Sequence, residues 1–266
     1  TFLAPLAKAG IRHLGVEPSA NVAEVAAGQG VKSLVGFLSP ELARQILQEH
    51  GPASAITAAN VICHIPDFNG VLQSAAILLK PEGVFIFEEP YLGDVLKKTS
   101  YDQFYDEHVF MFSALSVKWA AERQGLELIR VEHQATHGGS MRYTLCRKGV
   151  REITPSVAQI LEEERGAGLE TPGCYDRFRM ACEKSRDSLR AILDQLSAEG
   201  KTVVGYAATS KSTTVTNYCG ITPKHVAYIS DTTPIKQNKF SPGAHIPVKP
   251  HDVFKSQYPE YALLFG

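Results

Sequence analysis

The residues with the most chemical potential in this chain are concentrated in one short segment. Tyr105-Asp106-Glu107-His108 places a phenol, two carboxylates and an imidazole within four residues. The segment follows residues 83–88, whose apolar composition is typical of a buried strand. In an open α/β sheet the ligand crevice lies beyond the carboxyl ends of the strands. Titratable side chains at that place indicate general acid or base chemistry, and proton abstraction rather than binding alone.

A second histidine follows a neighbouring predicted strand. Residues 55–60 form a strand pattern of mostly small side chains, and the pattern leads into Asn60 and His64. A lone histidine is more often structural than catalytic. Two histidines, His64 and His108, that both follow strand ends are less easily explained by packing. We therefore expect at least one of them to act on a substrate.

The elements that must position these residues alternate along the chain. Such alternation of strands and helices predicts a parallel, doubly wound α/β sheet. Strand patterns occur at 12–16, 32–35, 55–60 and 83–88, and helical patterns at 20–27, 40–49 and 70–79. A helix at 113–124 and an antiparallel pair at 126–133 and 141–147 follow. An acid at the end of a strand in such a sheet can accept hydrogen bonds from ribose hydroxyls, so Glu17 is a candidate cofactor ligand.

A second α/β unit is predicted after a polar break near residue 150. A strand at 202–206, a loop of small residues, a helix to about residue 218 and a strand ending at Asp231 follow one another. This order is half of a mononucleotide-binding fold. Lys211 lies in the loop before the helix, where N–H groups suit a phosphate, although the spacing is not that of a Walker loop. We predict one domain over residues 1–150 and another over 151–266.

Composition and charge exclude several classes of function. The chain has 27 Lys and Arg against 28 Asp and Glu, so its formal net charge is -1. The sequence contains no stripe of basic residues, and nothing in it therefore points to a nucleic-acid partner. No apolar run is long enough to span a bilayer. The five cysteines include no CxxC pair, so no metal site is predicted. An odd number of cysteines, scattered along the chain, is typical of a protein from the reducing cytoplasm.

Several stretches together resemble the S-adenosylmethionine-dependent C-methyltransferases that act on nucleotide-linked deoxyketosugars in bacteria. The longest of them contains Tyr105 to His108, and the resemblance covers essentially the whole chain. The stretches are residues 58–66, 89–113, 137–143, 217–221 and 231–247.

The resemblance implies a class I, Rossmann-like methyltransferase domain followed by a second, smaller Rossmann-like domain that binds the nucleotide sugar. Members of the family also carry an N-terminal zinc domain, and this chain resembles them from just after the glycine-rich cofactor loop. The chain starts without Met and stops within an apolar run, so we interpret it as a fragment truncated at both ends. Zinc is expected only in the missing domain. The loop at 207–212 departs from the Gly-rich version expected in the family.

The resemblance also implies the catalytic roles. A methyl group can be added to carbon once a base has removed the proton beside a ketone. His108 is the expected base, with Tyr105 and Glu107 orienting its ring and tuning its basicity. His64 is expected to donate a hydrogen bond to the enolate oxygen.

Binding roles follow from the same resemblance. Glu17 is expected to bind the cofactor ribose, and Phe37, Ala59 and Asn60 to line the rest of that site. The nucleotide sugar, for which the resemblance suggests dTDP, is expected to contact Tyr91, Gly139, Arg142, Lys211 and Lys236. Two of these have other interpretations: Gly139 lies in a Gly-rich run that equally fits a hairpin turn, and the loop of Lys236 equally fits a solvated surface.

Two other functions fit the same fold. An NAD-dependent nucleotide-sugar oxidoreductase or epimerase would share the sheet and the substrate. The short-chain enzymes of that type use Tyr-x-x-x-Lys, and no tyrosine in this chain has a lysine four residues later. A non-catalytic nucleotide-binding module is the second alternative.

Overall fold

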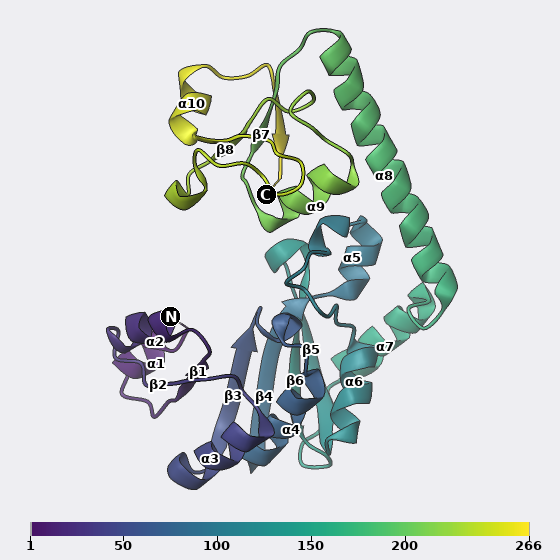
Figure 1. Cartoon of the computed structure of the whole chain (residues 1–266). Helices are drawn as coiled ribbons and strands as arrows, with labels where there is room; N and C mark the ends of the chain where they lie inside the picture. Colours follow the sequence, from purple (N-terminus) through teal and green to yellow (C-terminus); the bar gives the residue numbers. More distant parts are fainter. Residues whose placement is uncertain (1, 266) are drawn as a thin grey trace. The chain divides into compact units, whose positions relative to one another are not determined.

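The computed structural model describes residues 2–265, which divide into two compact units (Figure 1). The first unit consists of the residues up to Glu88 together with Ala114–Glu132 and Arg142–Ala158. The second consists of Glu89–Ser113, His133–Met141 and the residues from Gln159 onward. Each unit combines helices with parallel strands, which confirms the predicted α/β class.

The strands of the first unit form two groups. In the smaller group, β1 (Gly15–Glu17) pairs in parallel with β2 (Ser33–Val35). The larger group is a four-stranded sheet in the order β3-β4-β6-β5, and its first pair is parallel. A connection too short for a crossover joins β5 to β6, so these neighbours are antiparallel, as the sequence predicts. The strands of this sheet are β3 (Ala53–Ala59), β4 (Leu79–Pro90), β5 (Leu126–Gln134) and β6 (Ser140–Arg147).

Two helices of the first unit, α3 and α4, begin at side chains that cap them. Ser39 accepts a hydrogen bond from the backbone N–H of Leu42 at 3.2 Å, and Asp67 accepts one from Gly70 at 2.8 Å. These caps start α3 and α4 close to the predicted positions. The helices are α1 (Ala4–Lys8), α2 (Ala20–Ala27), α3 (Pro40–His50), α4 (Phe68–Leu78) and α6 (Ala114–Arg123), and η1 (Ile62–His64) is a 3₁₀ turn.

A small apolar cluster joins the strands of the first unit to helices α3 and α4. Val16 of β1, Leu34 of β2 and Ile56 of β3 pack against this cluster, which is built from the buried residues Ala43 and Ile46 of α3 and Leu78 of α4. Burying apolar surface is favourable, so these contacts stabilise the arrangement of strands and helices. The cluster therefore helps to position β1 and β3, the strands that precede the predicted cofactor residues.

The second unit is built on a parallel sheet in the order β10-β7-β8-β9. Thr209 caps α9 (Ser210–Tyr218) by accepting from the N–H of Ser212 at 3.1 Å, directly after β7. The predicted order of strand, small-residue loop, helix, strand and terminal acid is confirmed, because β8 ends at Asp231. The strands are β7 (Val203–Tyr206), β8 (Ile229–Asp231), β9 (Val248–Pro250) and β10 (Tyr261–Leu264).

The core of the second unit includes residues from distant parts of the sequence. Leu193 of the long helix α8 packs with Val203 and Ile229 of the sheet, and Tyr101 packs against the same cluster. The segment that precedes His108 is therefore anchored in this unit. Its remaining helices are α5 (Leu92–Lys98), α7 (Pro155–Ala167, which begins in the first unit), α8 (Pro172–Ala198) and α10 (His251–Ser256), with the 3₁₀ turns η2 (Tyr101–Gln103), η3 (Thr136–Gly138) and η4 (Pro234–Lys236).

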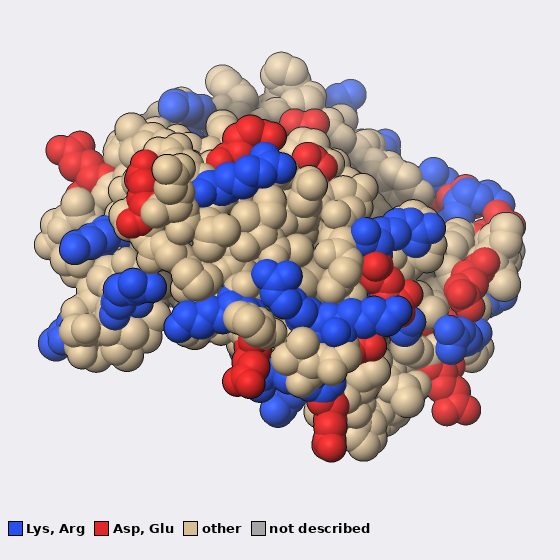
Figure 2. Space-filling view, turned by 90° about the horizontal axis from the view of Figure 1, so that it is seen from below, with Lys and Arg blue, Asp and Glu red and all other residues tan. Residues whose placement is uncertain are grey.

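Charged side chains of both signs occupy the surface. On the face drawn in Figure 2, Lys and Arg lie beside Asp and Glu at several places, and uncharged residues cover broad areas between them. None of the helices within residues 2–265 combines the length and the apolar character that crossing a membrane requires.

Candidate active site

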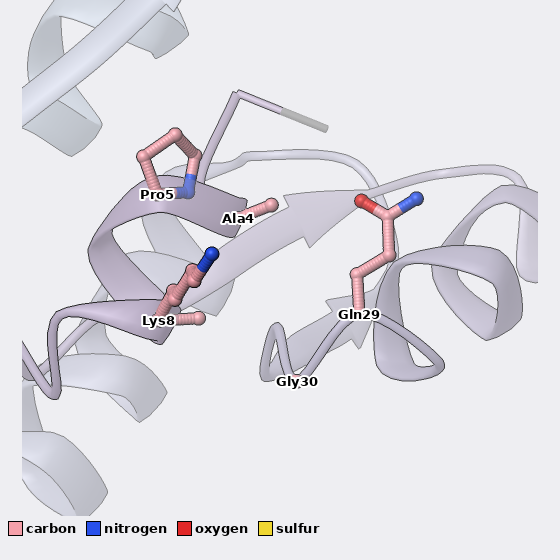
Figure 3. A pocket seen from close by; sticks show the side chains of 6 residues that line it. Ala4, Pro5, Lys8, Gln29 and Gly30 are labelled. Atoms are coloured by element: carbon pink, nitrogen blue, oxygen red, sulfur yellow. The ribbon is translucent and has the colours of Figure 1, made fainter.

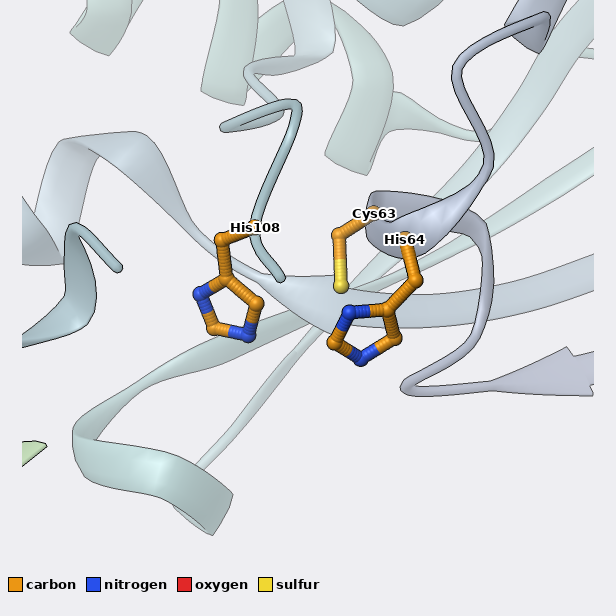
Figure 4. A group of neighbouring side chains, drawn as sticks. All are labelled: Cys63, His64 and His108. Atoms are coloured by element: carbon orange, nitrogen blue, oxygen red, sulfur yellow. The ribbon is translucent and has the colours of Figure 1, made fainter. Parts of the chain in front are cut away.

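The hydrogen bonds of His108 determine which of its ring nitrogens carries the proton. Nδ1 lies 2.8 Å from the backbone oxygen of Gln103, and because a carbonyl oxygen can only accept, Nδ1 carries hydrogen. The hydroxyl of Tyr105 lies 2.7 Å from Nε2, and the centroids of the two rings are 4.0 Å apart. In the neutral imidazole, Nε2 is consequently the basic atom and Tyr105 donates to it. Figure 4 shows the half-buried His108 on its loop.

The segment before His108 is fixed to helix α9. Thr214 donates to the backbone oxygen of Phe104 at 3.1 Å, and Nζ of Lys211 lies 3.8 Å from a carboxylate oxygen of Asp102. Burial raises the pKa of the Tyr101 phenol to about 12, so this anchor stays neutral at physiological pH. The predicted base and the predicted phosphate ligand Lys211 therefore belong to one packed assembly within the second unit.

The loop at residues 137–139 is held by hydrogen bonds to three consecutive carbonyl oxygens. The donors are Nε2 of Gln103 at 2.7 Å to the first, Nζ of Lys98 to the second, and the backbone N–H of Tyr91 at 3.1 Å to the third. All three donors come from the segment between β4 and His108. The loop and that segment thus form one rigid support.

Two predicted substrate residues, Gly139 and Tyr91, make contacts inside this support. Gly139 has φ 135°, and a Cβ there would lie 1.7 Å from a carboxylate oxygen of Asp94, so close packing alone requires glycine. The buried hydroxyl of Tyr91 interacts with the carboxylate of Glu164, and burial, reinforced by that charge, raises the pKa of Tyr91. Their contact with a substrate stays a prediction.

The predicted basic ligands Arg142 and Lys236 also have protein partners. The guanidinium of Arg142 donates to Glu88 at 2.8 and 3.1 Å. The ammonium of Lys236 donates to the backbone oxygen of Ala208 at 2.8 Å and lies 3.8 Å from the carboxylate of Asp231. A ligand at either side chain would share the cation with these partners.

Asp231 braces the loop that follows β7. Its two carboxylate oxygens accept from the N–H groups of Ala208 and Thr233, each at 2.7 Å. Burial alone would raise the pKa of Asp231, but the hydrogen bonds from Thr233 and Ala208 and the charge of Lys236 lower it overall. Ala207, at the start of the braced loop, has the left-handed φ of 73°.

Two predicted cofactor residues of the first unit lie at strand ends. Glu17 closes β1, and its Oε1 accepts from the N–H of Ser19 at 2.9 Å. Asn60 follows β3 with φ 52°, and its N–H donates to the backbone oxygen of Glu88 at 2.8 Å. The side-chain oxygen of Asn60 is buried and has no hydrogen-bond partner within residues 2–265. A buried acceptor left this way is costly, so the site fits a bound group that donates a hydrogen bond.

The remaining predicted residues are exposed. Phe37 follows β2 with 76% of its surface accessible, and Ala59 closes β3. His64 is the last residue of η1, next to the buried Cys63 (Figure 4), and Glu107 lies on the loop before His108. Their roles stay predictions.

A shallow pocket lies beside α1 and the turn after α2 (Figure 3). Its lining includes none of the predicted site residues, so the pocket is not part of the candidate active site. The residues that line it are Ala4, Pro5, Ala7, Lys8, Gln29 and Gly30.

Gln103 is a candidate functional residue that sequence reasoning missed. Its carbonyl oxygen binds the imidazole of His108, and its buried side chain binds the loop at residue 137. A single glutamine carries no motif of its own. The one available signal was its position five residues before His108.

Comparisons with solved structures give similarities at low sequence identity. A SAM-dependent methyltransferase from Anabaena variabilis is 22% identical with a TM-score of 0.41, and the match covers 52% of this chain and 68% of that one. The PH0226 protein from Pyrococcus horikoshii is 20% identical with a TM-score of 0.43, covering 55% and 76%.

Comparisons with protein families and curated proteins are more specific. Residues 1–131 match the model of a methyltransferase domain, and residues 135–266 match the model of a C-methyltransferase C-terminal domain. C-methyltransferase NovU of Streptomyces niveus is 34% identical over 260 residues, or 97% of this chain, which spans 62% of that relative's length. With its Rossmann-like first domain and a second α/β domain, the chain belongs to the C-methyltransferase family.

Proposed function

We propose that this chain belongs to an enzyme that transfers a methyl group from S-adenosylmethionine to a carbon beside a ketone in a nucleotide-linked deoxyketosugar, with dTDP as the expected nucleotide. Membership of the C-methyltransferase family supports the reaction type. The observation that carries the proposal is the contact of Nδ1 of His108 with the backbone oxygen of Gln103, an acceptor that assigns the proton of the neutral ring to Nδ1. It leaves Nε2 as a base, which carbon methylation requires.

The proposed chemistry begins with removal of the proton from the sugar carbon. Nε2 of His108 takes that proton. In the structure the hydroxyl of Tyr105 donates to Nε2, and this hydrogen bond breaks when the C–H group of the sugar approaches Nε2. The electron pair of the broken C–H bond moves into an enolate. We assign His64 to donate a hydrogen bond to the enolate oxygen, where charge develops.

The cofactor site is assigned to the first unit. S-adenosylmethionine supplies an activated methyl group when it is bound. Glu17 can accept from the ribose hydroxyls, because a carboxylate has acceptor capacity beyond its bond to Ser19. The buried oxygen of Asn60 can accept from the ammonium of the cofactor. Phe37 and Ala59 are assigned to line its remaining surface.

The nucleotide sugar is assigned to the second unit. Lys211 is the second residue of α9, where its charge adds to the positive end of the helix dipole. Asp102 lies 3.8 Å from its ammonium, so a diphosphate could replace this loose ion pair. Tyr91, Gly139 and Lys236, together with Arg142 of the first unit, remain the assigned neighbours of the sugar and nucleotide.

The substitution His108→Asn in the full-length protein tests the proposal. Removal of the base should slow both methyl transfer and solvent exchange of the sugar α-proton by about 10²–10⁴-fold. Deuterium incorporation measured by mass spectrometry reports the exchange step alone. Calorimetry measures the Kd of the nucleotide sugar, which should stay within about threefold of the parental value. His245→Asn, an exposed histidine in the same unit, is the matched control.

Two results would overturn the assignment. Exchange at the parental rate in His108→Asn would show that another group removes the proton. Loss of nucleotide-sugar binding in proportion to the loss of rate would show that His108 contributes binding instead of proton transfer.

A further inference from the structure

Gln103 connects two parts of the second unit through opposite ends of the same residue. Its side-chain amide donates to the backbone oxygen of His137 at 2.7 Å, and its own backbone oxygen accepts from Nδ1 of His108 at 2.8 Å. Its backbone N–H also donates to the backbone oxygen of Ser100 at 3.1 Å. Only 3% of Gln103 is exposed, so water competes little for these bonds.

The loop that receives the Gln103 amide is itself immobilised. His137 has the left-handed φ of 53°, and the following two carbonyl oxygens accept from Lys98 and from the N–H of Tyr91. Lys98 also lies 3.3 Å from the carboxylate of Asp94. The amide of Gln103 is therefore bonded to a fixed carbonyl group, and the orientation of its peptide group is fixed in turn.

The peptide oxygen of Gln103 is placed to influence the proton chemistry of His108, because it accepts from Nδ1 of the ring. A carbonyl that accepts from Nδ1 selects the tautomer in which Nε2 holds the lone pair. It also stabilises the imidazolium that forms when Nε2 takes a proton, because the Nδ1–H bond becomes more polar. If the Gln103 peptide rotated, the ring could carry its proton on either nitrogen, and Nε2 would be available for only part of the time.

We infer that Gln103 is a positioning residue for His108, acting through its buried amide on the loop at residues 137–139. This inference rests on the proposed role of His108 as a base. A merely structural role for Gln103 would lower the stability of the protein while leaving the tautomer and the basicity of His108 unchanged in the molecules that fold.

The substitution Gln103→Met in the full-length protein tests the inference, because Met keeps the shape of the side chain without its N–H donor. The rate constant kcat for solvent exchange of the sugar α-proton should fall by about 10- to 100-fold, with KM within about threefold of the parent. The midpoint of the pH–rate profile should move to lower pH, since the imidazolium loses stabilisation. Nitrogen-15 NMR of His108 should change from the Nδ1–H tautomer alone to a mixture. Gln195→Met on the exposed surface of α8 is the control.

Each outcome has one interpretation. A parental exchange rate, an unchanged pH midpoint or an unchanged tautomer in folded Gln103→Met would overturn the inference. If Gln103→Met does not fold, Gln103→Glu replaces it under the same criteria, because an ionised carboxylate of the same length cannot donate to the carbonyl oxygen of His137. His108→Asn distinguishes failure of the proposed function from failure of this inference. Exchange that persists in His108→Asn overturns the proposed function. If His108→Asn is inactive but Gln103→Met exchanges at the parental rate, only the role of Gln103 is overturned.

Discussion

Glu17 and Asp231 are acids at matching positions in the two units, since each is the last residue of a short parallel strand. Their carboxylates have different surroundings. Glu17 is half-buried and accepts one hydrogen bond from Ser19, whereas Asp231 is 7% exposed and accepts from both Ala208 and Thr233. An acid at a strand end can therefore serve a ligand or brace a loop, and the acceptor capacity left after folding decides between the two.

The substitution Asp231→Asn should produce the largest effect on this comparison. Asn offers one oxygen where the N–H groups of Ala208 and Thr233 need two, so one buried donor loses its partner. We expect the free energy of unfolding to fall by about 2–3 kcal/mol at pH 7. Urea unfolding followed by circular dichroism measures the change, and Asp252→Asn on the exposed surface of α10 should change it by less than about 0.5 kcal/mol.

The pH dependence of this difference gives a second measurement. The pKa of Asp231 is lower in the folded protein than its ordinary value of 3.8, so its carboxylate stabilises the folded state at pH values above 3.8. That stabilisation is lost as the pH falls through the folded-state pKa. The difference between the parent and Asp231→Asn should accordingly shrink between pH 5 and pH 3. A difference that stays constant over this range would show that Asp231 braces the loop without the help of its charge.

The substitution Glu17→Gln should affect binding where Asp231→Asn affects stability. Loss of a charged acceptor for ribose hydroxyls should weaken S-adenosylhomocysteine binding by about 1–2 kcal/mol, or roughly 5- to 30-fold in Kd, with the melting temperature of the unliganded protein almost unchanged. Calorimetry on the full-length protein measures the affinity, and Glu24→Gln on α2 is the exposed control. If NAD binds as tightly as S-adenosylhomocysteine, or if Glu17→Gln binds normally, the cofactor assignment of this strand end is wrong.

The elements that local patterns specify were the ones that could be predicted from the sequence. The helix predicted at 20–27 is α2, and the helix predicted at 40–49 is α3, which begins at Pro40. The strand predicted at 83–88 is longer, because β4 begins at Leu79 and residues 80–83 bulge between its pairings with β3. Such a bulge depends on the partner strand, which local periodicity does not describe.

The candidate site was predictable only in part for the same reason. The pattern of titratable residues led to Tyr105 and His108, which are hydrogen-bonded to each other at a separation of three residues. Gln103 escaped notice because its side-chain partner is 34 residues away. Asp231 was expected at a strand end and lies there. Whether its carboxylate oxygens already accept hydrogen bonds from the protein depends on the fold of the loop after β7, which the sequence pattern does not describe. Spacing in the sequence identifies the chemical groups, and long-range contacts decide which of them stay available.

The smallest expected effect concerns the left-handed residue that follows one strand in each unit, β3 in the first and β7 in the second. In the first unit this residue is Asn60, a type that tolerates a positive φ, whereas in the second unit it is Ala207 with φ 73°. Ala207→Gly should therefore raise the free energy of unfolding by about 0.5–1 kcal/mol, because relief of backbone strain exceeds the added entropy of the unfolded chain. Urea unfolding measures it against Ala208→Gly, the next residue, where φ is not positive and glycine should destabilise by about 0.5–1 kcal/mol. Equal destabilisation by both substitutions would mean that the loop braced by Asp231 holds no strain at Ala207, and that bracing alone distinguishes it from the strand ends of the first unit.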